Sequence, residues 1–190
     1  MSSFRYIAQR DSMDCGSACL LMIVEYYDVV ISQDGLKQDC ETGKSGVSLL
    51  GISKAAEKIG MRTVGGMVSL HSLIAEKPLP CIAHWDQNHF VVIYKIKKQR
   101  KGDHTIYVAD PGKGLLTYNK AEFCEHWAST KINGEEKGVV LLLEPTENFY
   151  TQNSTKQASK RYHLKFLWGY LKKYKRFFVQ LILGLLLSSL

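Results

Sequence analysis

The abrupt change from polar to apolar sequence at Cys15 constrains the fold of this chain more than any other feature. Gly16 follows the cysteine, and residues 18–24 are apolar without interruption before Tyr26 and Tyr27. A run of this kind predicts a helix that is buried on nearly all sides, with Cys15 at its N-terminus. Helix N-termini carry partial positive charge and free N–H groups, which favour the thiolate that attacks carbonyl carbons.

Two neighbours of Cys15 suit the same chemistry. Gly16 has no side chain, so a substrate backbone can pass close to the sulfur. Gln9, six residues upstream, can direct an amide N–H toward the same point. An ordinary core cysteine remains the alternative interpretation, because free cysteine is among the residues most often buried. A nucleophile would also need a histidine base and an orienting partner from elsewhere in the chain.

The remaining pattern predicts an α+β fold in which a helical half precedes an antiparallel sheet. Helical spacing is strongest in residues 49–59, and Ser69 and Asn119 stand where they can cap two further helices. Strand patterns cover residues 61–68, 81–85, 89–96, 104–110, 114–118 and 138–144.

The hairpin formed by residues 89–96 and 104–110 brings two polar side chains together. If its strands pair symmetrically about their connecting loop, Ile93 lies opposite Ile106 and His89 lies opposite Asp110. Opposed residues share one face of an antiparallel pair, with Cβ atoms about 5 Å apart. A carboxylate at that distance would orient the imidazole and stabilise its charged form. A one-residue change of register would separate the two groups.

The distribution of charged residues changes after Glu147. Eight of the 25 Lys and Arg residues follow it and no Asp or Glu does, so the preceding part holds 17 basic and 18 acidic residues. A nearly neutral domain argues against nucleic-acid binding. We therefore predict a domain at 1–147, a polar linker at 148–160, and an interfacial helix with a truncated first transmembrane helix at 161–190. The basic cluster at the entrance to that apolar segment predicts a membrane-attached chain with its domain on the cytoplasmic side.

The five cysteines indicate a reducing compartment. They are odd in number and scattered, with no CxxC pair and no spacing typical of zinc ligands. We therefore expect neither a disulfide framework nor a metal site.

These residues carry a resemblance to a known family. The sequence Gln9-x4-Asp14-Cys15-Gly16, the later His89-Phe-Val-Val and the Asp110-Pro111 pair resemble the papain-like leader-peptidase domain of peptidase-containing ABC transporters. Those transporters export bacteriocins and lantibiotics. The resemblance covers about residues 1–150, and the basic and apolar tail is similar to the membrane segment that follows in such exporters.

The resemblance implies a papain-like fold and a cysteine endopeptidase. It assigns the nucleophile to Cys15, the general base to His89, the orienting group to Asp110, and an oxyanion-hole donor to Gln9. It implies cleavage after a double-glycine-type pair (Gly-Gly, Gly-Ala or Gly-Ser) in precursor peptides whose leader binds as an amphipathic helix. A narrow slot would admit only such residues, and Trp85 is a candidate for its wall.

Further implications concern the full-length protein. It would be a homodimer that couples cleavage to ATP-driven export. ATP would serve only a nucleotide-binding domain that this sequence lacks, and the peptidase itself would need no cofactor. The alternatives are a non-cleaving module that binds leaders for an exporter, and another papain-like amide chemistry such as transglutamination.

Overall fold

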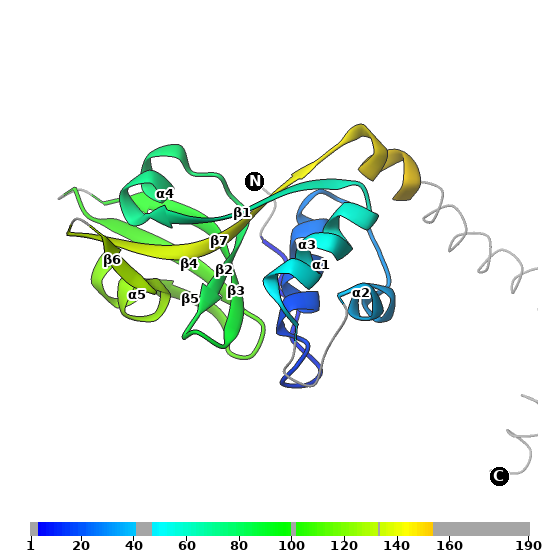
Figure 1. Cartoon of the computed structure of the whole chain (residues 1–190), viewed down its shortest axis with the longest axis horizontal. Helices are drawn as coiled ribbons and strands as arrows, with labels where there is room; N and C mark the ends of the chain where they lie inside the picture. The colour runs from blue at the N-terminus through cyan, green and yellow to red at the C-terminus, as the bar shows by residue number, and fades with distance from the viewer. Residues whose placement is uncertain (1–3, 41–46, 100–101, 133, 154–190) are drawn as a thin grey trace, which may run out of the picture. The chain divides into compact units, whose positions relative to one another are not determined.

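The computed structural model describes residues 4–40, 47–99, 102–132 and 134–153, which belong to one compact unit that ends at Asn153 (Figure 1). The helices are α1 (Cys15–Tyr26), α2 (Gln33–Asp39), α3 (Leu49–Lys58), α4 (Leu70–Glu76) and α5 (Lys120–Trp127). The strands are β1 (Met61–Ser69), β2 (Cys81–Trp85), β3 (His89–Lys98), β4 (His104–Asp110), β5 (Gly114–Tyr118), β6 (Thr130–Ile132) and β7 (Glu135–Pro145). This order confirms the predicted α+β class.

The strands form one antiparallel sheet in the order β1-β7-β2-β3-β4-β5, with β6 paired to β7. The short strand β6 was not predicted, and β7 begins at Glu135 rather than at residue 138. Both helix caps were predicted correctly. Ser69 accepts a hydrogen bond from the Ser72 N–H, and Asn119 forms a reciprocal capping box with Glu122.

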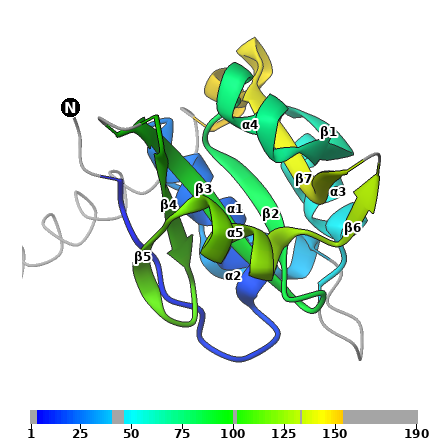
Figure 2. The same cartoon turned by 90° about the vertical axis from the view of Figure 1, so that its left-hand side faces the viewer.

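Two hydrophobic clusters cover opposite faces of the sheet. Ile82, Phe90 and Val92 face the cluster that contains α1, α2 and α3, whereas the alternate residues Ala83 and Val91 face the cluster that contains α4 and α5. Figure 2 shows the same arrangement, with α5 in front of the sheet and α1 behind it. Residues 90–93 of β3 are buried on both faces and are all apolar, whereas the lysines of β3 lie toward its far end.

Helix α1 is the centre of the first cluster. Residues 15–24 are all buried, as the uninterrupted apolar run predicted. One turn after Cys15, the Cys19 thiol donates a hydrogen bond to the Phe90 carbonyl oxygen at 3.3 Å. This contact ties the first turn of α1 to the start of β3 and so brings Cys15 near His89.

The register of the β3–β4 hairpin differs from the prediction. Ile93 pairs with Val108 and Ile96 with Ile106, and the register shifts by one between Ile93 and Lys95. The predicted pairs of Ile93 with Ile106 and of His89 with Asp110 are therefore wrong as directly opposed pairs. The strands begin to pair at Lys98 and His104, three residues from the predicted register, and the bulge between Ile93 and Lys95 reduces this difference to two.

The compact unit extends six residues beyond the predicted boundary at 147. Residues 147–153 are helical, and Phe149 and Asn153 are fully buried. The Asn153 side chain donates hydrogen bonds to the carbonyl oxygens of Ile59 and Phe149. Most of the predicted linker and the whole predicted membrane segment lie outside the described residues. Within the described part, no helix is both long and apolar enough to cross a membrane.

Candidate active site

Cys15 is the first residue of α1 and is 5% exposed. The preceding Asp14 stands at the N-cap, but its side chain makes no capping hydrogen bond. Its backbone oxygen instead accepts hydrogen bonds from the Ala18 N–H and the Ser17 hydroxyl, both at 3.0 Å. Cys15 therefore lies in the first turn of α1, where helix N–H groups have no acceptor within the helix.

His89 and Asp110 are hydrogen-bonded, as the sequence predicted. His89 Nε2 lies 2.9 Å from Asp110 Oδ1, and the carboxyl group is 1% exposed. The pairing tolerates the altered register because a shift of two residues keeps both side chains on the same face as diagonal neighbours, within reach of long side chains. The Gly112 N–H also donates to Asp110 Oδ1 at 2.8 Å, which fixes the carboxylate.

The electrostatics favour the charged forms of this pair. Burial opposes the protonation of His89, but hydrogen bonds and charge interactions with Asp110 and Cys15 outweigh burial and raise the pKa of His89 to about 9. Burial also disfavours the Asp110 carboxylate, yet His89, the Gly112 N–H and Lys113 together hold the Asp110 pKa below its usual value. Because Nε2 is engaged by Asp110, Nδ1 is the imidazole nitrogen that remains for the Cys15 sulfur.

Gln9 lies against the turn that follows Asp110. Its backbone N–H donates to the Pro111 carbonyl oxygen at 3.0 Å, and its side-chain Nε2 is 3.7 Å from the point where a Cβ on Gly112 would stand. The Tyr6 hydroxyl donates to the same Pro111 oxygen at 3.0 Å. The chain before α1 is thus fastened to the β4–β5 turn, beside the His89–Asp110 pair.

Gly16 and Trp85 do not occupy the positions that were predicted for them. A Cβ on Gly16 would lie 2.8 Å from side-chain atoms of both Ile52 and Val47, so this glycine allows α1 to pack against α3 rather than a substrate against the sulfur. Trp85 is 1% exposed and belongs to the cluster of α4 and α5. A side chain buried this deeply offers no surface to a peptide.

One ion pair beside Cys15 was not predicted from the sequence. Lys37 of α2 places its Nζ 2.7 Å from both Asp14 Oδ1 and Asp11 Oδ2. Asp14 is 1% exposed, so its carboxylate requires a partner of opposite charge. The sequence showed Asp14 beside Cys15, but it could not predict that Lys37 is its partner. Lys37 lies 23 positions later, and no sequence pattern links the two residues.

The other four cysteines are buried and unsuited to nucleophilic attack. Burial raises the pKa of the Cys81 thiol to about 12, and burial together with nearby acidic groups does the same for Cys40 and Cys124. Burial, together with Cys15 and Asp110, raises the pKa of Cys19 as well. These thiols remain protonated at neutral pH and serve as core residues.

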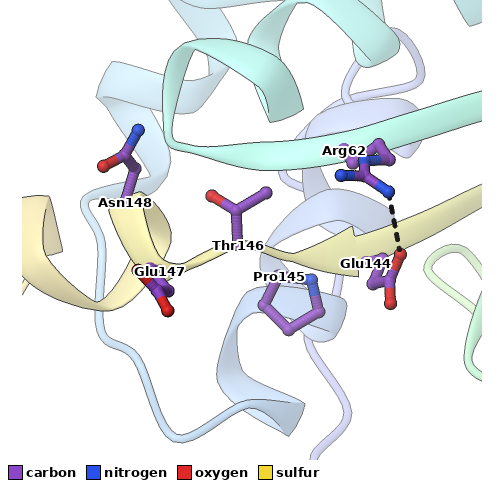
Figure 3. A pocket seen from close by; sticks show the side chains of 6 residues that line it. All are labelled: Arg62, Glu144, Pro145, Thr146, Glu147 and Asn148. Carbon is purple, nitrogen blue, oxygen red and sulfur yellow. Dashed lines mark ion pairs between the residues drawn. The ribbon is translucent and has the colours of Figure 1, made fainter.

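A surface pocket elsewhere has a different composition. This pocket has a volume of about 480 Å³. Its lining residues are Arg62, Glu144, Pro145, Thr146, Glu147 and Asn148 (Figure 3). Arg62 and Glu144 form an ion pair at 4.0 Å at one side of this pocket. The pocket contains neither a thiol nor an imidazole, so it offers no nucleophile–base pair. Within the described residues, no group of three or more His, Cys, Asp or Glu side chains is arranged to hold a metal ion.

Comparisons with known proteins identify the family of the chain. The model of the "Peptidase C39 family" matches residues 3–148. The chain is 33% identical over 150 residues to the lactococcin-G-processing and transport ATP-binding protein LagD of Lactococcus lactis subsp. lactis, covering 76% of this chain and 19% of that protein. It is 29% identical over 163 residues to the colicin V secretion/processing ATP-binding protein CvaB of Escherichia coli, covering 86% of this chain and 21% of that protein. The chain thus spans about a fifth of the length of these relatives.

Solved structures share the fold. A double glycine motif protease from an AMS/PCAT transporter, solved in complex with the leader peptide, superposes with a TM-score of 0.64 at 29% identity and covers 76% of this chain and 93% of that one. The peptidase domain of Streptococcus ComA, a bi-functional ABC transporter involved in a quorum sensing pathway, superposes with a TM-score of 0.61 at 24% identity. This second match covers 76% of this chain and all of that one and speaks for the fold alone.

Proposed function

Because the chain belongs to the peptidase C39 family, we propose that it is a cysteine endopeptidase that removes the leader from exported peptide precursors by cutting after a double-glycine-type pair. The observation that carries the proposal is the His89–Asp110 hydrogen bond at the N-terminus of a helix that begins with Cys15. The solved complex of a related protease with its leader peptide supports the substrate class.

The proposed mechanism uses Cys15, His89 and Asp110. The Cys15 thiolate attacks the carbonyl carbon of the second glycine to form a thioester with the leader, and the His89 imidazolium gives its proton to the departing amine of the next residue. Water then attacks the thioester while His89 accepts a proton from it, and the leader leaves with a new carboxylate. Asp110 holds the imidazole through Nε2, so that Nδ1 is the nitrogen that gives a proton to the amine and accepts one from the water.

The negative charge on the tetrahedral intermediate needs donors. We assign this role to the Cys15 backbone N–H, which stands in the first turn of α1, and to the side-chain amide of Gln9. The position of Gln9 beside the Asp110–Gly112 turn supports the assignment. The thiol and the imidazole carry out every step, so the peptidase chemistry needs no cofactor.

We extend the proposal to the full-length protein from its relatives. Their names combine processing with transport or secretion and with ATP binding. The leader would bind as an amphipathic helix. The domain would stand on the cytoplasmic side of a membrane transporter, and that transporter would be a homodimer that uses ATP for export.

The test is cleavage of a synthetic precursor with a Gly-Gly leader, followed by mass spectrometry. The wild-type chain should release the leader with its C-terminus at the second glycine, and Cys15→Ala should bind the precursor without cutting it. Cys124→Ala is the matched control, because that thiol is buried far from the pair. Binding without cleavage by the wild type would favour a non-cleaving leader-binding module. Turnover of peptides that lack a glycine pair would favour a different amide chemistry.

A further inference from the structure

The turn that leads into His89 has an unusual backbone. Trp85 to Asn88 form a β-turn in which the Asn88 N–H donates to the Trp85 carbonyl oxygen at 3.2 Å. Both central residues have positive φ, 48° at Asp86 and 61° at Gln87. This pattern belongs to type I′ turns, which favour Asn-Gly because side chains other than Asn, Asp and Gly disfavour positive φ. With Gln at the second position, this turn needs support from outside.

The His84 side chain contacts the Gln87 backbone, and α5 supports the turn at Asp86. The Asp86 N–H donates to the His126 carbonyl oxygen at 2.9 Å, and His126 Nδ1 lies 2.8 Å from Asp86 Oδ1. The His126 ring stacks on Trp85 with centroids 5.2 Å apart and planes 19° apart, and meets Tyr118 edge-on at 5.8 Å. Asp86 is therefore held through both its backbone and its side chain by a single residue.

Helix α5 is a firm base for these contacts. Its N-terminus is closed by the Asn119–Glu122 capping box, and Phe123 and Trp127 are fully buried on the sheet. The contacts between His126 and the turn also lie close to the candidate active site, because Trp85 pairs directly with His89 across β2 and β3. The conformation of the turn therefore fixes the position of His89, the first residue of β3, and of its imidazole.

We propose that the Asp86–His126 pair is a positioning device for the active site, which holds the turn 85–88 in its left-handed form and thereby places His89 against Cys15. His126 acts through Asp86 and does not touch the substrate. This inference rests on the proposed peptidase function. Backbone strain of this kind persists only where surrounding contacts over-determine it, and it is concentrated at functional sites.

The experiment measures kcat and KM of the full chain with the Gly-Gly precursor. His126→Ala should lower kcat about tenfold, since sub-ångström displacement of a catalytic group is costly, and should leave KM within about twofold. His126→Asn, whose amide can reach Asp86 from nearly the Nδ1 position, should recover most of that loss. The decisive variant adds Asp86→Asn and Gln87→Gly to His126→Ala. The resulting Asn-Gly favours the turn by itself, so kcat should return to within about threefold of wild type.

Asn119→Ala provides the matched control, because it removes the N-terminal cap of the same helix without touching the turn. The proposal is overturned if His126→Ala keeps full kcat, if Asn-Gly fails to restore kcat in a folded variant, or if Asn119→Ala costs as much kcat as His126→Ala. A wild-type chain that cuts no precursor would instead refute the peptidase function itself, and the two failures are therefore distinguishable.

Discussion

Replacing Asp110 by Asn should change how activity depends on pH, and the structure gives the size of the change. Asn keeps the shape of the side chain and an oxygen that can accept from His89 Nε2, but it removes the charge that lies 2.9 Å from that nitrogen. Without this charge the pKa of His89 should fall from about 9 toward its ordinary value of 6.5. The imidazolium that protonates the leaving amine should then be lost at lower pH.

The magnitude follows from these two pKa values. At pH 7.5 the protonated fraction of His89 is about 97% for a pKa of 9 and about 9% for 6.5, which predicts a loss of up to about tenfold in kcat/KM. At about pH 6 most imidazole is protonated in either case, so the loss should be less than twofold. The pH dependence of stability follows from the raised pKa of His89. Protonated His89 stabilises the folded chain fully below about pH 6.5, and this stabilisation disappears as the pH rises through about 9.

The assay is kcat/KM for precursor cleavage between about pH 5 and about pH 10. The alkaline limb of the wild-type profile should lie near pH 9 and that of Asp110→Asn closer to 6.5. Asp103→Asn is the control, since Asp103 sits at the opposite end of the same hairpin, where it accepts from the His104 N–H at 2.8 Å. An alkaline limb that stays in place in folded Asp110→Asn would refute the reasoning, as would a loss of equal size at every pH.

Two further predictions concern the surroundings of Cys15. Gly16→Ala should lower the free energy of unfolding by about 1–3 kcal/mol in urea titrations, because its Cβ would lie 2.8 Å from Ile52 and Val47; unchanged stability with lost precursor binding would instead restore the substrate role for Gly16. Lys37→Met should lower the free energy of unfolding by about 1–2 kcal/mol in the same titration, since it removes the cation that lies 2.7 Å from the buried Asp14 carboxylate. Lys37→Arg keeps the charge and should therefore retain most of the wild-type stability. A loss as large in the surface variant Lys58→Met would show that the ion pair beside Cys15 contributes no more than an ordinary surface pair.

The sequence indicated the main elements because their signals are local. The apolar run after Cys15 predicted a buried helix, and the residue types at Ser69 and Asn119 predicted two helix caps. His89 and Asp110 were predicted to meet on the basis of a register that proved wrong. The prediction survived because an error of two positions preserves the face of a strand, although an error of one would have destroyed it.

The features that escaped prediction depend on tertiary packing. Whether Gly16 faces a substrate or another helix depends on where α3 lies, and only the fold brings Ile52 against it. Trp85 ends a strand near His89, yet α5 covers it. Residues 148–153 have the polar composition of a linker, but Phe149 and Asn153 anchor them to the domain. Sequence spacing alone contains none of these contacts.

The account depends above all on the sulfur of Cys15 being activated by the imidazole of His89. The direct measurement is the rate and site of alkylation by limiting iodoacetamide near pH 7, read by peptide mapping. The account predicts that Cys15 is modified while the four other buried cysteines are spared, and that His89→Ala slows the reaction by at least about tenfold in a folded chain. Slow modification of Cys15 in the wild type, or an equal rate in His89→Ala, would contradict it.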